Sequence, residues 1–245
     1  MTQQAAKLTL AIEVSNPTSG PEASQVGLGM IGGGICEVLG VEGVDPGSRQ
    51  RDDLLQACAR LLEAHRKLPR DLESIAVDVG PGGFTGLRVA VAAAATMAEA
   101  LGLGIIAVES TRVASVDASD RPGAFMVALA SKKLSAWVEV FGVDGGPVAP
   151  RGGSVLSAEE FEALEPAQSE ARPPFRLIAD GFLPTAWEAS ARRRGWLIEP
   201  MRLSAESLLK AAARVPAASV ITPEALRPIY AREPEAVTLW RARHG

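Results

Sequence analysis

The sequence predicts an α/β protein with two similar lobes, each built on a mixed β-sheet. The main observation is an order of strand-like and helix-like segments, β-β-β-α-β-α-β, that occurs in residues 1–112 and again in residues 113–245. The composition agrees, because 47% of the 245 residues are apolar and 22% are charged, as in proteins that bury a core. We expect the two ranges to be the lobes, with the C-terminal segment packing on either one.

The first lobe begins with a short apolar strand, residues 8–14. Two further strands, 25–31 and 35–41, flank a glycine turn and form a hairpin. A helix is expected next, with Asp52 as its N-cap, because apolar residues recur at offsets of three and four. This stripe consists of Leu54, Leu55, Cys58, Leu61, Leu62 and His65.

A second helix lies between two buried strands, 74–79 and 104–109. It is expected from about Thr85 to Leu101, and Gly102 should end it. This helix is apolar almost all round, so it has no obvious solvent face. We expect one side to pack on its own sheet, while the other lies under the first helix or is covered by a partner.

The second lobe repeats this order of elements without repeating the residues. A helix should begin at Ser157, since Glu160 is placed to complete a capping box. Strands are predicted at 124–130, 134–141, near 147–156, 175–179 and 195–199, and further helices at 184–194 and 204–214. The doubled layout resembles the actin, Hsp70 and sugar-kinase superfamily, in which two ribonuclease-H-like lobes face a nucleotide cleft.

Composition excludes several classes of function. The formal net charge of −4 argues against a polycationic nucleic-acid binder. Cys36 and Cys58 have no C-x-x-C spacing, so we expect both to be reduced and packed. His65 and His244 are the two histidines, too few for most histidine-dependent metal and triad sites. The apolar run from 8 to 12 is too short for a signal peptide, so a cytoplasmic location is expected.

Residues 27–32 spell G-x-G-x-x-G, a possible dinucleotide fingerprint, with Asp52 about 20 residues beyond. A dinucleotide site needs a helix directly after these glycines, to receive the pyrophosphate. Here the glycines lie in a strand and its hairpin turn. We therefore interpret residues 27–32 as a strand and not as a cofactor site.

The segment 80–88, G-P-G-G-F-T-G-L-R, joins a buried strand to a helix and fits neither phosphate-binding spacing. One interpretation is that its bare backbone approaches an anion at the helix start. The other is a tight crossing in which Gly86 lets the helix touch the sheet, with Thr85 as N-cap and Arg88 paired with a carboxylate. The sequence leaves both open.

This segment resembles a known family. Asp78-Val79-Gly80-Pro81-Gly82-Gly83-Phe84-Thr85-Gly86-Leu87-Arg88, followed by Gly104-Ile105-Ile106-Ala107-Val108-Glu109-Ser110, is similar to the GPGSFTGLR segment and next strand of the TsaB (YeaZ) proteins. Pro228-Ile229-Tyr230-Ala231-Arg232 is similar to their terminal P-x-Y-x-R signature. The resemblance implies an accessory subunit, without an ATPase of its own, of the bacterial machinery that makes threonylcarbamoyladenosine in tRNA.

The chain departs from the family pattern at several places, one of which is a long S-N-P-T-S-G-P-E loop after the first strand. Glu13-Val14-Ser15 stands where Asp-Thr-Ser is usual, Gly83 replaces a serine, and the second-lobe hairpin, 130–135, lacks the family's acidic residue. A kinase-type cleft needs acidic groups to hold magnesium near the phosphates. The missing hairpin acid agrees with a subunit that has no ATPase of its own. Glu13 and Asp180 remain as candidate magnesium ligands, so the rival function is an active ATP-dependent kinase or ATPase of the same fold.

The resemblance also implies how such a subunit works. Its two first-lobe helices would join two helices of the catalytic subunit TsaD, with a TsaE-like ATPase as a further candidate partner and a homodimer as the alternative. It implies no catalytic residue, metal or cofactor, no membrane, and contact with tRNA through the complex alone. The predicted partner-binding residues are Leu54, Leu55, Cys58, Leu61, Leu62, Val91, Ala94 and Ala95, and the motif loop is Gly80, Pro81, Gly82, Thr85, Gly86 and Arg88.

Overall fold

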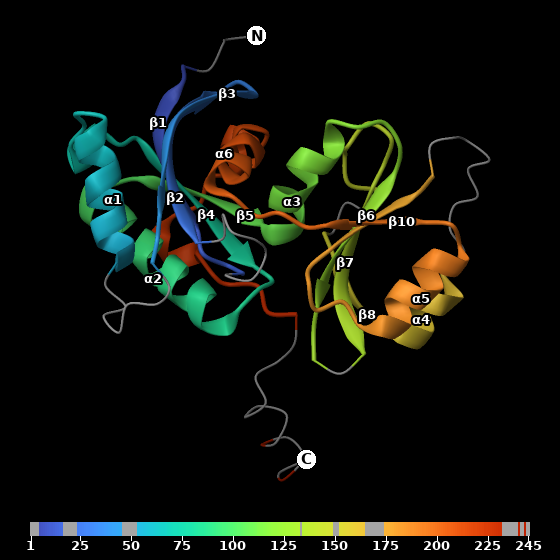
Figure 1. Cartoon of the computed structure of the whole chain (residues 1–245). Coiled ribbons are helices and arrows are strands. Elements are labelled where there is room, and N and C mark those ends of the chain that lie inside the picture. Colours follow the sequence, from blue (N-terminus) through green and yellow to red (C-terminus); the bar gives the residue numbers. More distant parts are fainter. Residues whose placement is uncertain are drawn as a thin grey trace.

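The computed structural model of the chain contains two five-stranded mixed sheets with helices between and outside them (Figure 1). The structure describes residues 5–16, 24–45, 53–132, 134–148, 152–164, 174–231, 240 and 243. The expected N-cap, Asp52, and the motif residue Arg232 lie outside these residues.

The first sheet has the strand order β3-β2-β1-β4-β5. Strand β1 pairs antiparallel with β2 and parallel with β4, so it lies in the middle of the sheet, as its apolar run predicts. The elements are β1 (Lys7–Glu13), β2 (Gln25–Gly32), β3 (Ile35–Gly43), α1 (Asp53–Ala64), β4 (Ser74–Gly80), α2 (Phe84–Leu101), β5 (Gly104–Glu109) and α3 (Ser110–Ser119).

The second sheet has the order β10-β9-β6-β7-β8, which is the same topology read from the other edge. Its central strand β6 again pairs antiparallel with the next strand and parallel with the strand after the first helix. The elements are β6 (Phe125–Ala130), β7 (Ser135–Phe141), β8 (Ser154–Ser157), α4 (Ala158–Ala163), β9 (Arg176–Ala179), α5 (Thr185–Arg193), β10 (Leu197–Pro200) and α6 (Ala205–Ala213). The predicted fold, two ribonuclease-H-like lobes, is confirmed.

The buried residues form three clusters that define the layers. One cluster packs α1 and α2 on the outer face of the first sheet, and another packs α4 and α5 on the outer face of the second. The third lies between the sheets and includes residues of α3 and α6. The predicted boundary at residue 112 falls inside α3, which passes from one lobe to the other (Figure 1).

The C-terminal part of the described chain packs on the first lobe. Helix α6 contacts all five strands of the first sheet. The positions of Gly27 and Gly29 show why the second strand is rich in glycine, since added Cβ atoms would come within 3.0 and 3.1 Å of side-chain carbons of α6. After α6, Ile221 exchanges two hydrogen bonds of 2.9 Å with Ile105 at the edge of the sheet. The G-x-G-x-x-G segment is thus a strand, as predicted.

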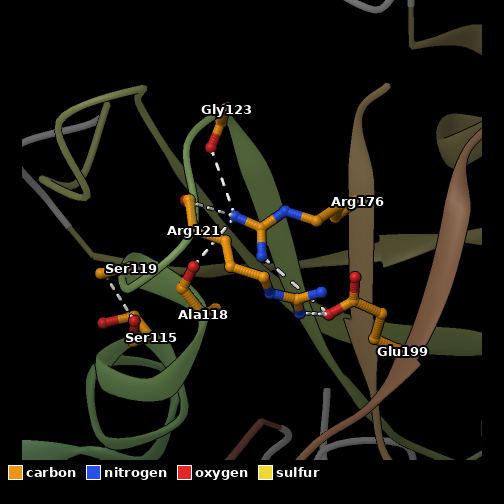
Figure 2. Close-up of polar contacts among 7 residues, drawn as sticks. All are labelled: Ser115, Ala118, Ser119, Arg121, Gly123, Arg176 and Glu199. Carbon is orange, nitrogen blue, oxygen red and sulfur yellow. Dashed lines mark hydrogen bonds and ion pairs between the residues drawn. The ribbon is translucent and has the colours of Figure 1, made fainter. Parts of the chain in front are cut away.

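A buried arginine fixes the C-terminal end of α3 to the second sheet (Figure 2). The guanidinium of Arg176, at the start of β9, donates to the carbonyl oxygens of Ala118, Arg121 and Gly123 at 2.9, 3.1 and 3.4 Å. A cation suits these carbonyl groups because the C-terminal end of a helix is electronegative. Burial lowers the pKa of Arg176, and Glu199 partly offsets this effect.

Two local predictions are also confirmed. The hydroxyl of Ser157 accepts from the backbone of Glu160 at 3.1 Å, and the carboxylate of Glu160 accepts from the backbone of Ser157 at 2.7 Å. Both cysteines are free thiols. Cys58 is buried, and burial raises the pKa of its thiol to about 12.

Candidate functional site

A buried polar cluster lies at the carboxyl ends of β1 and β4. Ser15 donates from its hydroxyl to Glu13 at 2.7 Å and lies 3.1 Å from Asp78, so it bridges the two carboxyl groups. Asp78 also accepts from the hydroxyl of Ser110 and the backbone of Gly80, both at 2.7 Å. Parallel pairing of β1 with β4 brings these groups together although they are far apart in sequence.

Burial and the closeness of the two carboxyl groups disfavour their charged forms. Burial raises the pKa of Glu13 well above its usual range, and the nearby Asp78 carboxylate raises it further. Burial also raises the pKa of Asp78, while hydrogen bonds from Glu13, Ser110 and Gly80 oppose that shift. Because Asp78 is the better supplied with donors, we assign the higher pKa to Glu13.

The two acidic residues of the rival function, Glu13 and Asp180, each form hydrogen bonds within their own lobe. Asp180, in the second lobe, accepts from the backbone of Ala130 at 3.0 Å and of Phe182 at 3.1 Å, so both its oxygens are engaged. Glu13 is bound to Ser15 and Asp78 within the first lobe. Within the described residues, no group of three or more His, Cys, Asp or Glu side chains could hold a metal ion.

The motif loop packs directly on the end of β1. An added Cβ at Gly82 would lie 2.4 Å from the carbonyl oxygen of Ser15, and one at Gly86 would lie 2.2 Å from that of Val14. The backbone of Gly83 donates to Ser15 at 2.6 Å. These contacts support the tight-crossing interpretation of the loop, in which the glycines let helix and strand backbones touch.

Two details of that interpretation are wrong. The N-cap of α2 is Gly83, and Thr85 is an exposed residue of the first turn. The guanidinium of Arg88 lies over the ring of Phe84, 4.0 Å from its centroid, where a carboxylate partner had been expected. Pro81 is buried in the loop, and its peptide bond with Gly80 is cis.

The two segments that carry the family resemblance meet in space. The backbone of Ile229 donates to Val79 at 2.6 Å. Gly80 has a φ of +99°, and an added Cβ there would lie 2.6 Å from the carbonyl oxygen of Ile229. The rings of Phe84 and Tyr230 are 5.3 Å apart. The loop and the C-terminal motif therefore form one structural unit, which the sequence alone did not indicate.

The structure divides the predicted partner-binding residues into two groups. Leu55 is 56% exposed, and Val91 and Ala95 are partly exposed. The others are buried in the core of the first lobe: Leu54, Cys58, Leu61, Leu62 and Ala94. The accessible surface of α2 instead includes Ala92 and Thr96, which the sequence analysis did not select.

Asp78 and Ser110 are site residues that sequence reasoning missed. Asp78 lies in a seven-residue strand that is buried throughout. A carboxylate in such a strand needs donors nearby, because burying it unpaired is costly. That signal was available in the sequence. No such signal exists for Ser110, because its hydrogen bond to Asp78 depends on where β5 ends relative to β4.

Comparison with known proteins finds similarity to the TsaD and YeaZ proteins. Residues 42–136 match the family model described as TsaD, tRNA N6-adenosine threonylcarbamoyltransferase. An uncharacterized protein with similarity to peptidase YeaZ, from Pseudomonas aeruginosa, has a TM-score of 0.69 and 20% identity, over 92% of this chain and 100% of that chain. YeaZ from Pseudomonas aeruginosa has a TM-score of 0.66 and 19% identity, over 91% of this chain and 99% of that chain.

Among proteins of curated function, none matches the sequence. At identities near 20%, the two solved structures establish a shared fold, while the TsaD match covers less than half of the chain. The chain thus has the fold of YeaZ and a segment that matches the TsaD family model, and its resemblance to the TsaB (YeaZ) proteins is confirmed.

Proposed function

We propose that this chain is a non-catalytic subunit that supports a TsaD-like catalytic subunit in threonylcarbamoyl transfer to adenosine of tRNA. The observation that carries the proposal is the outward face of α2. This 18-residue helix has a mean hydropathy of 1.3, yet only Leu87, Ala90, Ala94 and Ala98 are buried. An apolar helix face left accessible on a folded lobe is typical of a protein–protein interface.

The chemistry of that face favours another helix as its contact. Ala92 and Thr96 are exposed, and Ala93, Ala95 and Met97 are partly exposed. Small side chains allow close approach of a second helix, as in helical bundles. Helix α1 lies on the same outer side of the first sheet (Figure 1) and adds the exposed Leu55. By length and composition α2 could also cross a membrane, the one described helix of which this is true.

The closed polar cluster supports a non-catalytic role. Glu13 is 1% exposed and Asp78 is fully buried, and both are bonded to neighbouring serines. A magnesium-binding carboxylate must be ionised and reachable, whereas the raised pKa of Glu13 favours its neutral form. ATP binding by the isolated chain that is lost on Asp180→Ala would instead favour the kinase or ATPase function.

Purification from the native cell extract tests this proposal. We expect a larger, TsaD-like protein to co-purify with the wild type and to be identified by mass spectrometry. Ala92→Arg should abolish its recovery, because a long cation would stand in the centre of the helix face. Ala189→Arg is the matched control, since Ala189 is an exposed alanine of α5 in the other lobe. Equal recovery with both variants would refute the α2 interface, and homodimerisation in its place would favour a self-associating protein.

A further inference from the structure

The two charged residues of α2 lie on one face of the helix. Arg88 and Glu99 are both exposed and are eleven residues apart, which is about three helical turns and about 16 Å. The positions between them on this face are small or apolar and at least partly exposed: Val91, Ala92, Ala95 and Thr96. We call these six residues the α2 stripe. It has a cation near the amino end of the helix, an apolar centre and a carboxylate near the carboxyl end.

The order of these two charges is the reverse of what a helix itself favours. The helix dipole stabilises acidic residues near the amino end and basic residues near the carboxyl end. Helices α5 and α6 both follow this rule, with an acidic residue in the first turn and a basic residue in the last. In α2 the cation, Arg88, lies in the second turn and the carboxylate, Glu99, in the last. This order does not stabilise α2, which points to a contact outside the helix.

Neither charge of the α2 stripe is neutralised within the part of the chain that the structure describes. The ion pairs there all involve other residues. The guanidinium of Arg88 lies 4.0 Å from the centroid of the Phe84 ring, and that ring in turn contacts Tyr230. These contacts hold the cation in place at the surface. Less conformational freedom is therefore lost when Arg88 binds a carboxylate of another molecule.

We propose that the α2 stripe binds a helix of the TsaD-like subunit that carries an acidic residue opposite Arg88 and a basic residue opposite Glu99. This inference rests on the function proposed above, which names the partner. The small residues between the charges allow two helix backbones to approach closely. Complementary charges across an interface fix the choice of partner and its orientation. A partner helix with the usual order of charges runs parallel to α2 in this contact.

A second copy of this chain would also present matching charges. Two α2 helices packed antiparallel would place Arg88 of each copy opposite Glu99 of the other. Exchange of the two charges, in the variant Arg88→Glu/Glu99→Arg, separates the two cases. Antiparallel self-pairing survives the exchange, because the exchanged charges still face each other, whereas the helix of a TsaD-like subunit would meet like charges at both ends. The exchange also keeps the net charge of −4, so nonspecific electrostatic effects stay the same.

Calorimetric titration of the full chain with the TsaD-like protein recovered from the cell extract tests the proposal. We expect the exchange to weaken binding at least about a hundredfold, because two ion pairs become two contacts of like charge. Arg88→Gln alone removes one pair and should weaken binding about tenfold. The matched control is the exchange Glu188→Arg/Arg192→Glu in α5 of the other lobe, which should leave the affinity unchanged. Circular dichroism checks that all the variants are folded.

Three results would overturn the proposal. The first is an affinity for the TsaD-like protein that is the same in the α2 exchange and the wild type, which would leave the proposed function standing. The second is an equal loss of affinity in the α2 exchange and the α5 control, which would make the position of the charges irrelevant. The third is a wild type that binds no TsaD-like protein and forms homodimers in sedimentation equilibrium, with or without the exchange. That result would overturn the proposed function as well.

Discussion

Helices α2 and α5 occupy equivalent positions in the two lobes, each between two parallel strands, yet they differ in character. Helix α5 has nine residues and buries Trp187, while Arg192 and Arg193 in its last turn are exposed. Helix α2 is twice as long, and its exposed positions are mostly apolar or small. Since the same topology is satisfied by a short amphipathic helix, the apolar outward face of α2 is not a requirement of the fold. We attribute it to a partner.

The turns that precede these helices differ in the same way. In the first lobe the glycine-rich loop presses against the end of β1, whereas Gly181, in the corresponding turn of the second lobe, has nothing within 4 Å of an added Cβ. The first-lobe turn also binds Ile229 and Tyr230. The first lobe thus holds its long helix by backbone contact, and four experiments can sharpen or break this contrast.

The largest effect is expected for Gly86→Ala. Alanine favours a helix over glycine by about 1 kcal/mol, but its Cβ would lie 2.2 Å from the carbonyl oxygen of Val14, so α2 must move. We expect a net loss of about 3 kcal/mol in the free energy of unfolding, measured by urea denaturation. Gly181→Ala should change it by less than about 0.5 kcal/mol. Similar small effects in both variants would contradict the contrast between the turns.

The stability of the second lobe should depend on a buried cation, Arg176, at the amino-terminal end of β9. Arg176 starts β9, while the equivalent first residue of β4, Ser74, forms a 2.6 Å hydrogen bond with Thr9. Arg176→Met leaves the carbonyl groups at the end of α3 without their donor, and we expect a loss of about 2 to 3 kcal/mol. Arg121→Met removes an exposed ion pair with Glu199 and should cost less than about 1 kcal/mol. Thermal denaturation compares the two variants.

The raised pKa of Glu13 predicts a dependence of stability on pH. Because the pKa of Glu13 is higher in the folded than in the unfolded chain, the folded state binds more protons above pH 4.5. The free energy of unfolding should therefore fall as pH rises, by at most about 1.4 kcal/mol per pH unit from this group. Glu13→Gln mimics the protonated form and should remove this part of the slope. If Glu13→Gln has the same slope as the wild type, a group other than Glu13 causes the pH dependence.

The smallest effect on stability is expected at the outward faces of the two helices. Ala92→Arg and Ala189→Arg both add an exposed cation to a helix, and each should change the free energy of unfolding by less than about 0.5 kcal/mol. Chemical denaturation checks this directly. A large loss of stability in Ala92→Arg alone would mean that the outward face of α2 supports the fold. The contrast with α5 would then no longer argue for a partner.

Much of the fold could be predicted from local patterns. The apolar periodicity of α1, the capping box at Ser157 and the stop at Gly102 each depend on neighbouring residues, and the structure confirms them. The strand pattern of residues 27–32 was also sufficient to reject a cofactor site. These features are fixed by sequence spacing alone, so no knowledge of tertiary contacts was needed.

The candidate site could be predicted less well, because it depends on contacts between distant segments. The Glu13–Asp78 pair arises from the register of two parallel strands, and the contact of Phe84 with Tyr230 joins residues of two separate motifs. The apolar stripe of α1 showed a buried face without showing which side faces the sheet. That side proved to be the one with Leu54, Cys58 and Leu61, which are buried, so the proposed partner surface consists of Leu55 and the outward face of α2.

Amide hydrogen exchange on the chain with and without a TsaD-like subunit tests the central claim most directly. We expect exchange to slow in residues 84–101 on adding the subunit, with α5 unchanged, because a covered helix opens less often. Unchanged exchange in α2, or slowing confined to the second lobe, would contradict the assignment of α2 as the partner surface.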